Sequence, residues 1–125
     1  MTATYIDQVV SFSEPPIPMG PFVTPPERLL KGDPKQGIAN YVTGEEGRLL
    51  CGLWESEPGK WKAVAERTEF CYIISGEVII SDAKGGQRRY KAGDAFMLPY
   101  GFDGYWEVLE TCQKYYVILQ DRPQS

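Results

Sequence analysis

The residues best suited to acid–base or anion-binding chemistry gather in one short segment of this sequence, from Lys62 to Tyr72. Glu69 is a carboxylate that can accept or donate a proton, and Lys62 and Arg67 are cations that can hold an anionic group. The chain of 125 residues has no histidine. Ser-His-Asp triads, Cys–His pairs and histidine-based zinc, iron or manganese sites are therefore excluded by the residue inventory.

Three cysteines, Cys51, Cys71 and Cys112, are widely spaced and form no C-x-x-C pair. This pattern is typical of reduced, buried thiols in a cytoplasmic protein, and no activating base accompanies Cys71. Residues 1–10 lack the basic and apolar stretches of an export signal, and the longest apolar run, Tyr115–Leu119, is too short to cross a membrane. We therefore expect a cytoplasmic protein with no membrane partner.

The balance of charge argues against polyanionic partners. Acidic residues outnumber basic ones by 17 to 13, which gives a formal charge of −4. Nucleic acids and anionic membranes bind clustered cations. The densest basic cluster surrounds Gly85 and Gly86, which mark a hairpin tip, and it consists of Lys84, Arg88, Arg89 and Lys91. We interpret it as a solvated turn and expect no nucleic-acid partner.

Residues 1–36 are predicted to form an extended arm. Seven of the ten prolines of the chain lie in this segment. Proline removes a backbone donor and disfavours helix in the residue before it, so the arm is neither a helix nor a central strand. Its many apolar residues predict that it is ordered by contact, either with its own domain or with a partner subunit.

Residues 37–125 are predicted to form one all-β domain, because short β-branched and aromatic runs alternate with glycine or proline. The periodicity from Tyr105 to Leu119 also fits a helix, but its aromatic and β-branched clusters favour two strands joined by a turn at Glu110–Gln113. The predicted strands are Ile38–Thr43, Arg48–Trp54, Lys60–Ala65, Glu69–Ser75, Glu77–Ser81, Gln87–Tyr90, Ala95–Leu98, Tyr105–Leu109 and Lys114–Leu119.

Two glycine-anchored segments, Gly59–Gly76 and Gly93–Gly104, resemble the two motifs of the cupin superfamily. Glu69 and Gly76 have the spacing of the first motif, and the second motif matches at Gly93, Pro99 and Gly101. The longer match, over roughly residues 49–118, is similar to the subgroup placed with (S)-ureidoglycine aminohydrolase and EutQ. This resemblance implies a single-domain jelly-roll barrel, also called a double-stranded β-helix, with the arm preceding it.

The resemblance breaks at the residues that bind the metal of the family. The histidine pair of the first motif falls on Ala63 and Ala65, or on Lys62 and Val64, and the later histidine falls on Gly104. Of the four usual ligands only Glu69 remains, and one carboxylate does not hold a transition metal. We expect no metal and no other cofactor.

In a cupin barrel, Glu69 would face the interior and Tyr72 would face the opposite side of the sheet. Two readings of Glu69 stay open. An apolar pocket would raise its pKa and make it a general acid or base, whereas Arg67 or a nearby lysine would turn it into a structural ion pair. The candidates for contacting a ligand are Arg67, Trp106, Tyr72, Lys62, Phe96 and Trp54.

Three functions remain open from the sequence. The first two use the barrel pocket for a small polar or anionic metabolite, either in a metal-independent enzyme with Glu69 as the proton carrier or in a non-catalytic binding protein. The third is an accessory or structural subunit with a filled barrel. For each of them we expect a homodimer, because the edge strands of a jelly roll must be covered.

Overall fold

The computed structural model describes residues 6, 9–12 and 19–120 of the chain, and nine strands dominate them. The predicted all-β fold class is confirmed. The described residues contain no α-helix; two three-residue 3-10 turns among them are η2 (Pro26–Arg28) and η3 (Glu45–Gly47). The strands are β1 (Gly20–Phe22), β2 (Leu29–Lys31), β3 (Gln36–Gly44), β4 (Leu49–Ser56), β5 (Gly59–Val64), β6 (Thr68–Asp82), β7 (Gln87–Lys91), β8 (Ala95–Leu98) and β9 (Asp103–Leu119). No helix among the described residues is long and apolar enough to cross a membrane.

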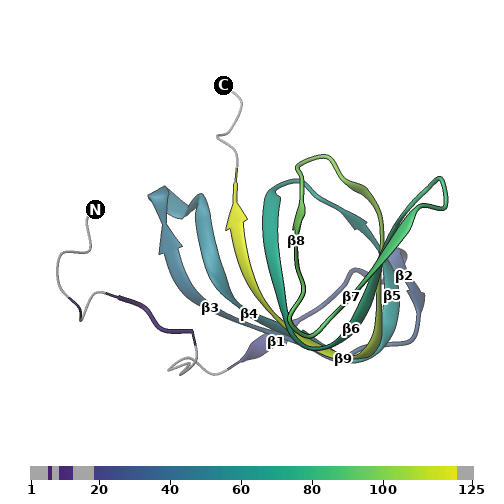
Figure 1. The fold of residues 1–125 in the computed structure, drawn as a ribbon, viewed down its shortest axis with the longest axis horizontal. Coiled ribbons are helices and arrows are strands. Elements are labelled where there is room, and N and C mark those ends of the chain that lie inside the picture. The colour runs from purple at the N-terminus through teal and green to yellow at the C-terminus, as the bar shows by residue number, and fades with distance from the viewer. Residues whose placement is uncertain (1–5, 7–8, 13–18, 121–125) are drawn as a thin grey trace.

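All strands pair antiparallel in one sheet that curls around an interior space (Figure 1). Along one path the order is β1-β3-β4-β9-β5-β2, and β6 pairs with β7, β8 and β9. The long strand β9 joins the two halves of the curl. Its C-terminal half lies between β4 and the start of β6, and its N-terminal half lies between β5 and the end of β6.

Strands β6 and β9 are each longer than predicted. The sequence predicts a break at Gly76 and a turn at Glu110–Gln113, and both predictions are wrong because each strand runs through as one bent element. The register between β6 and β9 shifts three times around Gly76, which has φ 86°. A Cβ at Gly76 would meet the Thr111 carbonyl and lie 2.7 Å from the Cα of Cys112. Glycine therefore lets the two strands bend together without ending.

The described part of the proline-rich segment lies on its own domain. Strand β1 pairs with β3 and strand β2 pairs with β5, so both form edges of the sheet. A 3-10 turn begins at Pro26, where the fixed φ of proline suits a first helical position. Phe12 packs edge-on against Tyr41 and Tyr115, with ring centroids 5.0 and 5.4 Å apart. Residues 1–5, 7–8 and 13–18 of the predicted arm lie outside the described residues.

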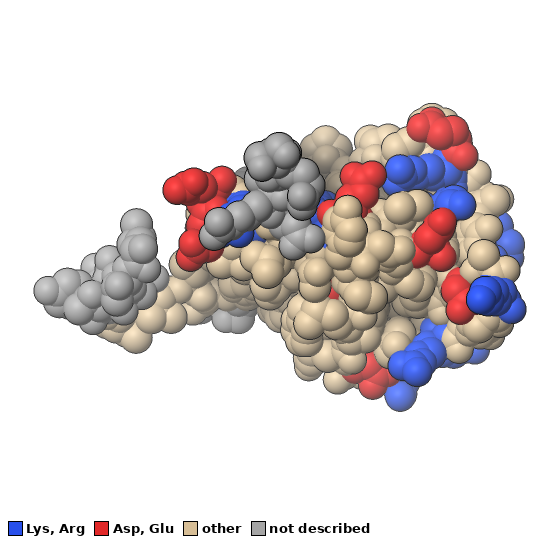
Figure 2. Space-filling model, turned by 90° about the horizontal axis from the view of Figure 1, so that it is seen from above, with Lys and Arg blue, Asp and Glu red and all other residues tan. Residues whose placement is uncertain are grey.

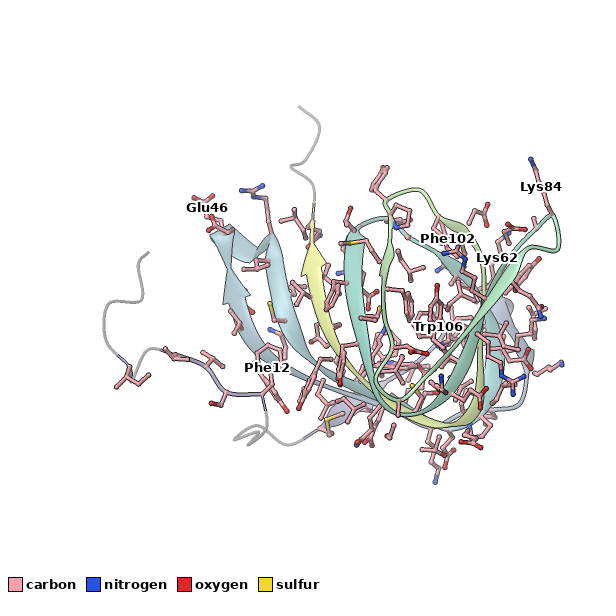
Figure 3. The ribbon with its side chains drawn as sticks, in the orientation of Figure 1. Phe12, Glu46, Lys62, Lys84, Phe102 and Trp106 are labelled. Carbon is pink, nitrogen blue, oxygen red and sulfur yellow. The ribbon has the colours of Figure 1, made fainter. Side chains whose placement is uncertain are left out.

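The core fills one part of the curl with aliphatic, aromatic and sulfur side chains, among them Ile73, Val78 and Val108. All three cysteines are free and buried, as the sequence predicts. Seen from above, positive and negative side chains are interspersed at the end of the molecule opposite the N-terminal residues (Figure 2). Some of them pair across strands, as Arg89 does with Glu77 and Lys31 with Glu107. At the tip of the β6–β7 hairpin, Lys84 projects away from the sheet (Figure 3).

Candidate functional site

A cavity of about 220 Å³ remains unfilled inside the curl of the sheet. This volume corresponds to about seven water molecules. Trp106 lies within the curl (Figure 3) and forms part of the cavity wall. The lining residues are Phe22, Gln36, Ile38, Trp54, Trp61, Ala63, Val64, Ala65, Arg67, Glu69, Leu98, Phe102, Trp106, Lys114, Tyr116 and Ile118. The wall is mostly apolar, with a few polar groups, as is usual for sites that take small molecules.

The central polar feature of the cavity is an ion pair between Glu69 and Lys114. Lys114 Nζ donates to Glu69 Oε2 over 2.7 Å. The lysine side chain is 8% exposed and the glutamate side chain 21%. Strand pairing explains the contact, because Glu69 pairs with Ile118 and Ile73 pairs with Lys114 on adjacent strands β6 and β9. The inward alternation of both strands then brings the two side chains together.

Each member of this pair sets the charge of the other. Burial raises the pKa of Glu69, but the charge and hydrogen bond of Lys114 outweigh it, so the pKa lies below the ordinary value of 4.5. Burial lowers the pKa of Lys114, but Cys71 and Glu69 outweigh it, so the pKa lies above 10.5. Of the two readings of Glu69 that the sequence leaves open, this geometry favours the ion pair with a nearby lysine, which is Lys114. Both groups are charged at neutral pH.

Aromatic rings surround the lysine. Lys114 Nζ lies 4.3 Å from the ring centroid of Trp106 and 4.7 Å from that of Trp54. These distances allow cation–π attraction, which is stronger where water is excluded. The two indoles also meet edge-on, with centroids 5.8 Å apart. The lysine is thus held by one carboxylate and two aromatic faces.

The thiol of Cys71 completes the cluster without being a nucleophile. Its Sγ donates to Glu69 Oε2 over 3.4 Å and lies 3.7 Å from Lys114 Nζ. Burial is the main reason that the pKa of Cys71 rises to about 12. A thiol at neutral pH is a weak donor and a poor nucleophile. Cys71 therefore helps to orient the carboxylate.

Three other polar groups belong to residues of the wall, and two of them have hydrogen-bond partners. Trp54 Nε1 donates to Gln36 Oε1 over 3.2 Å, and Tyr116 donates to Asn40 Oδ1 over 2.9 Å. Trp106 Nε1 is buried and has no acceptor among the described residues. An unsatisfied buried donor costs stability, so Trp106 is less well satisfied than the other two.

The structure brings together four of the seven residues that the sequence singles out: Glu69, Arg67, Trp54 and Trp106 all line the cavity. The other three lie elsewhere. Tyr72 is half-exposed on the outer face and stacks on Tyr115, Lys62 pairs with Asp103 at 3.4 Å on the surface, and Phe96 lies behind Trp106 with ring centroids 5.8 Å apart.

Sequence reasoning missed several residues of the wall. Lys114 is one of them, because lysine is normally exposed and nothing in its sequence environment marks it as buried. The alternation of side chains along β9 could have indicated that Lys114 is buried. It places Lys114 on the same inward face as Trp106, Val108 and Tyr116. Gln36 and Phe22 had no such signal, because they come from the segment predicted as an arm.

The residues present do not fit the metal site of the cupin motifs. Ala63 and Ala65, at the predicted positions of the first two histidines, line the cavity with methyl groups, and Gly104 has no side chain. The remaining ligand, Glu69, already contacts an ammonium group. Within residues 6, 9–12 and 19–120, no three His, Cys, Asp or Glu side chains converge. Such a donor set suits neither a transition metal nor calcium.

Acidification is expected to remove the stabilisation that Glu69 provides. Its folded pKa lies below the unfolded value of 4.5, so the contribution is present above that pH and is lost as the pH falls through the folded pKa. Glu69→Gln should therefore be less stable than the wild type at neutral pH, and the difference should shrink as the pH falls below 4.5. Urea unfolding of both proteins across this range measures it. A difference that stays constant would show that Glu69 is not the ionised partner of Lys114.

Comparisons with known proteins agree with this architecture. The model of the EutQ-like cupin domain family matches residues 43–116. A protein of the DUF861 family from Pseudomonas syringae superposes with a TM-score of 0.76 at 20% identity, over 84% of this chain and 46% of that one. This chain thus spans about half the length of that relative. No curated protein matches the chain.

Two further solved structures cover most of the chain. A protein from Thermotoga maritima, described as a predicted oxalate decarboxylase, gives a TM-score of 0.67 at 21% identity, over 91% of this chain and all of that one. A putative ethanolamine utilization protein Q from Salmonella typhimurium gives 0.62 at 17% identity, over 84% of this chain and 99% of that one. These structures confirm the jelly-roll fold. The chain therefore belongs to the EutQ-like cupin domain family.

Proposed function

We propose that this chain is a ligand-binding cupin domain whose cavity takes one small polar or anionic molecule. The observation that carries the proposal is a cavity of about 220 Å³ whose wall combines aromatic rings with a buried ion pair. Polar groups placed in an otherwise apolar wall orient a ligand and select it. The third function, an accessory or structural subunit, assumes a filled barrel, and the open cavity argues against that assumption.

Binding fits the charges of the site better than proton transfer does. A general acid or base works best when its pKa lies near the working pH. The ion pair moves the pKa of Glu69 down and that of Lys114 up, away from neutrality in both cases. A metal-independent enzyme that uses Glu69 would first have to separate this pair. The fixed, oppositely charged pair instead serves as a dipolar element for recognition.

Intrinsic fluorescence tests whether a ligand enters the cavity. All three tryptophans of the chain, Trp54, Trp61 and Trp106, line it. We expect phenylacetate or its neutral amide to change the emission and to raise the melting temperature with increasing concentration. Ala63→Phe, which fills the cavity, should abolish both effects.

The matched control is Ala95→Phe, because Ala95 is exposed on β8 and does not line the cavity. This variant should bind as the wild type does. Retained binding in Ala63→Phe together with a folded melting profile would contradict the proposed location of the site.

We also propose that the protein is a homodimer. Phe70, Tyr72 and Met97 leave an apolar outer face 39%, 39% and 57% exposed, and Phe70 pairs directly with Met97 across β6 and β8. Such adjacent exposed apolar side chains commonly mark an interface. Native mass spectrometry should then show twice the chain mass of 14.1 kDa. Phe70→Glu should shift the mass to the monomer and Lys84→Glu should not, and a wild-type monomer would contradict the proposal.

A further inference from the structure

A second, polar cleft adjoins the cavity. It is lined by Arg28, Val64, Ala65, Glu66, Arg67, Glu69 and Gln120. Val64, Ala65, Arg67 and Glu69 line the cavity as well. The polar cleft therefore borders the cavity on the side of the β5–β6 connection, where Glu69 and Arg67 face both spaces.

The residues around this boundary include positive side chains that have no ion-pair partner in the described part of the chain. Arg28 and Arg67 are both exposed, and among the described residues no carboxylate lies within ion-pair distance of either. Glu69 is already paired with Lys114, which leaves Glu66 as the one other carboxylate lining the polar cleft. The linings of the cavity and the polar cleft together hold three cations, Arg28, Arg67 and Lys114, against two carboxylates, Glu66 and Glu69, a net charge of +1 in a chain whose formal charge is −4.

The cavity on the other side of the boundary is shaped for an apolar body. Trp61, Leu98 and Phe102 contribute to its wall together with the two indoles around Lys114. The polar cleft thus offers guanidinium groups to an anion, while the cavity offers aromatic and aliphatic surface.

We propose that the polar cleft and the cavity bind one molecule together, a small organic acid whose carboxylate lies between Arg28 and Arg67 and whose apolar body enters among the tryptophans. This inference rests on the proposed function and names its ligand class. Guanidinium groups form charge-assisted, often bidentate, hydrogen bonds with carboxylates. A net charge of +1 matches a singly charged carboxylate better than a doubly charged phosphate monoester.

The proposal also gives the proline-rich segment a part in the site. Arg28 ends the 3-10 turn η2, directly before β2, which pairs with β5. Phe22, at the end of β1, lines the cavity. Two short edge elements from the predicted arm therefore complete a site that the barrel alone would leave without Arg28.

The test compares three probes of nearly the same shape: phenylacetate, phenylacetamide and phenethylamine. Their affinities are measured by tryptophan fluorescence and by isothermal titration. We expect phenylacetate to bind about tenfold more tightly than the amide, since one charge-assisted hydrogen bond provides this factor. The cationic amine should bind least. Arg67→Gln and Arg28→Gln should each weaken binding of the acid more than binding of the amide, and so reduce the preference for the acid.

Lys84→Gln is the matched control, because it removes one exposed cation at a hairpin tip far from the cavity (Figure 3). It should retain the full preference for the acid. Equal affinities for acid and amide would overturn the ligand class and leave the proposed cavity intact. An equal loss in Lys84→Gln would assign the preference to overall charge and overturn the arginine site. If no probe changes the fluorescence, both the inference and the proposed function are wrong.

Discussion

Lys114→Met is expected to lower the free energy of unfolding by about 3 kcal/mol, the usual cost of leaving one partner of a buried ion pair uncompensated. Glu69 would then have no cation at 2.7 Å, and burial would raise its pKa, so it either holds an uncompensated charge or takes up a proton, and both cost stability. Glu69→Gln should cost a similar amount, because it leaves the ammonium of Lys114 unpaired in a mostly apolar wall. Urea unfolding of the single variants measures both values.

The double variant separates the energy of the interaction between Glu69 and Lys114 from the separate effects of changing each side chain. Lys114→Met combined with Glu69→Gln should lose less stability than the sum of the two single changes, because the double variant leaves no buried charge behind. Lys62→Met is the matched control, since Lys62 pairs with Asp103 at 3.4 Å with both side chains about half exposed. An exposed pair contributes less than about 1 kcal/mol. Equal losses in Lys62→Met and Lys114→Met would contradict the structural role given to the buried pair.

Gly104→Ala is expected to cost about 3 kcal/mol, at the upper end for forcing extra atoms into a packed site. Gly104 lies in β9 between Ala63 of β5 and Asp82 of β6. A Cβ there would clash with the carbonyl oxygen of Ser81 and lie 2.7 Å from the ring of Phe102. The carbonyl belongs to a paired strand and cannot move without disturbing the sheet. Denaturant unfolding measures the loss.

Gly20→Ala is the control for this change. Gly20 also lies in a strand, but the nearest atom to its added Cβ is the Ile38 carbonyl oxygen at 3.8 Å, an ordinary contact. Its stability should stay within about 0.5 kcal/mol of the wild type. A wild-type melting profile for Gly104→Ala would show that β6 and β9 are not as close as described. If the prediction holds, the missing histidine of the second motif cannot simply be restored at Gly104.

The local pattern of the sequence was enough to predict the fold class and four of the residues that line the cavity. Gly93, Pro99 and Gly101 punctuate short strands, and the spacing of Glu69 and Gly76 carries the resemblance to the cupin motifs. Both signals depend on neighbours in sequence, so they survive without tertiary information. The continuity of β6 and β9 could not be predicted. From the sequence, Gly76 looks like the end of a strand. Its packing against Thr111 and Cys112 shows that it instead allows the strand to bend.

The sequence by itself determined that histidine chemistry is absent and that Glu69 stands alone among the usual ligands. The tertiary structure decided what that carboxylate does, because its partner lies 45 residues later in the chain. A lysine in a strand is normally exposed. The register between β6 and β9 turns Lys114 inward instead, which lowers the pKa of Glu69 and leaves the cavity walled by three tryptophans. Charge pairing across strands depends on register, and register is set by the whole sheet.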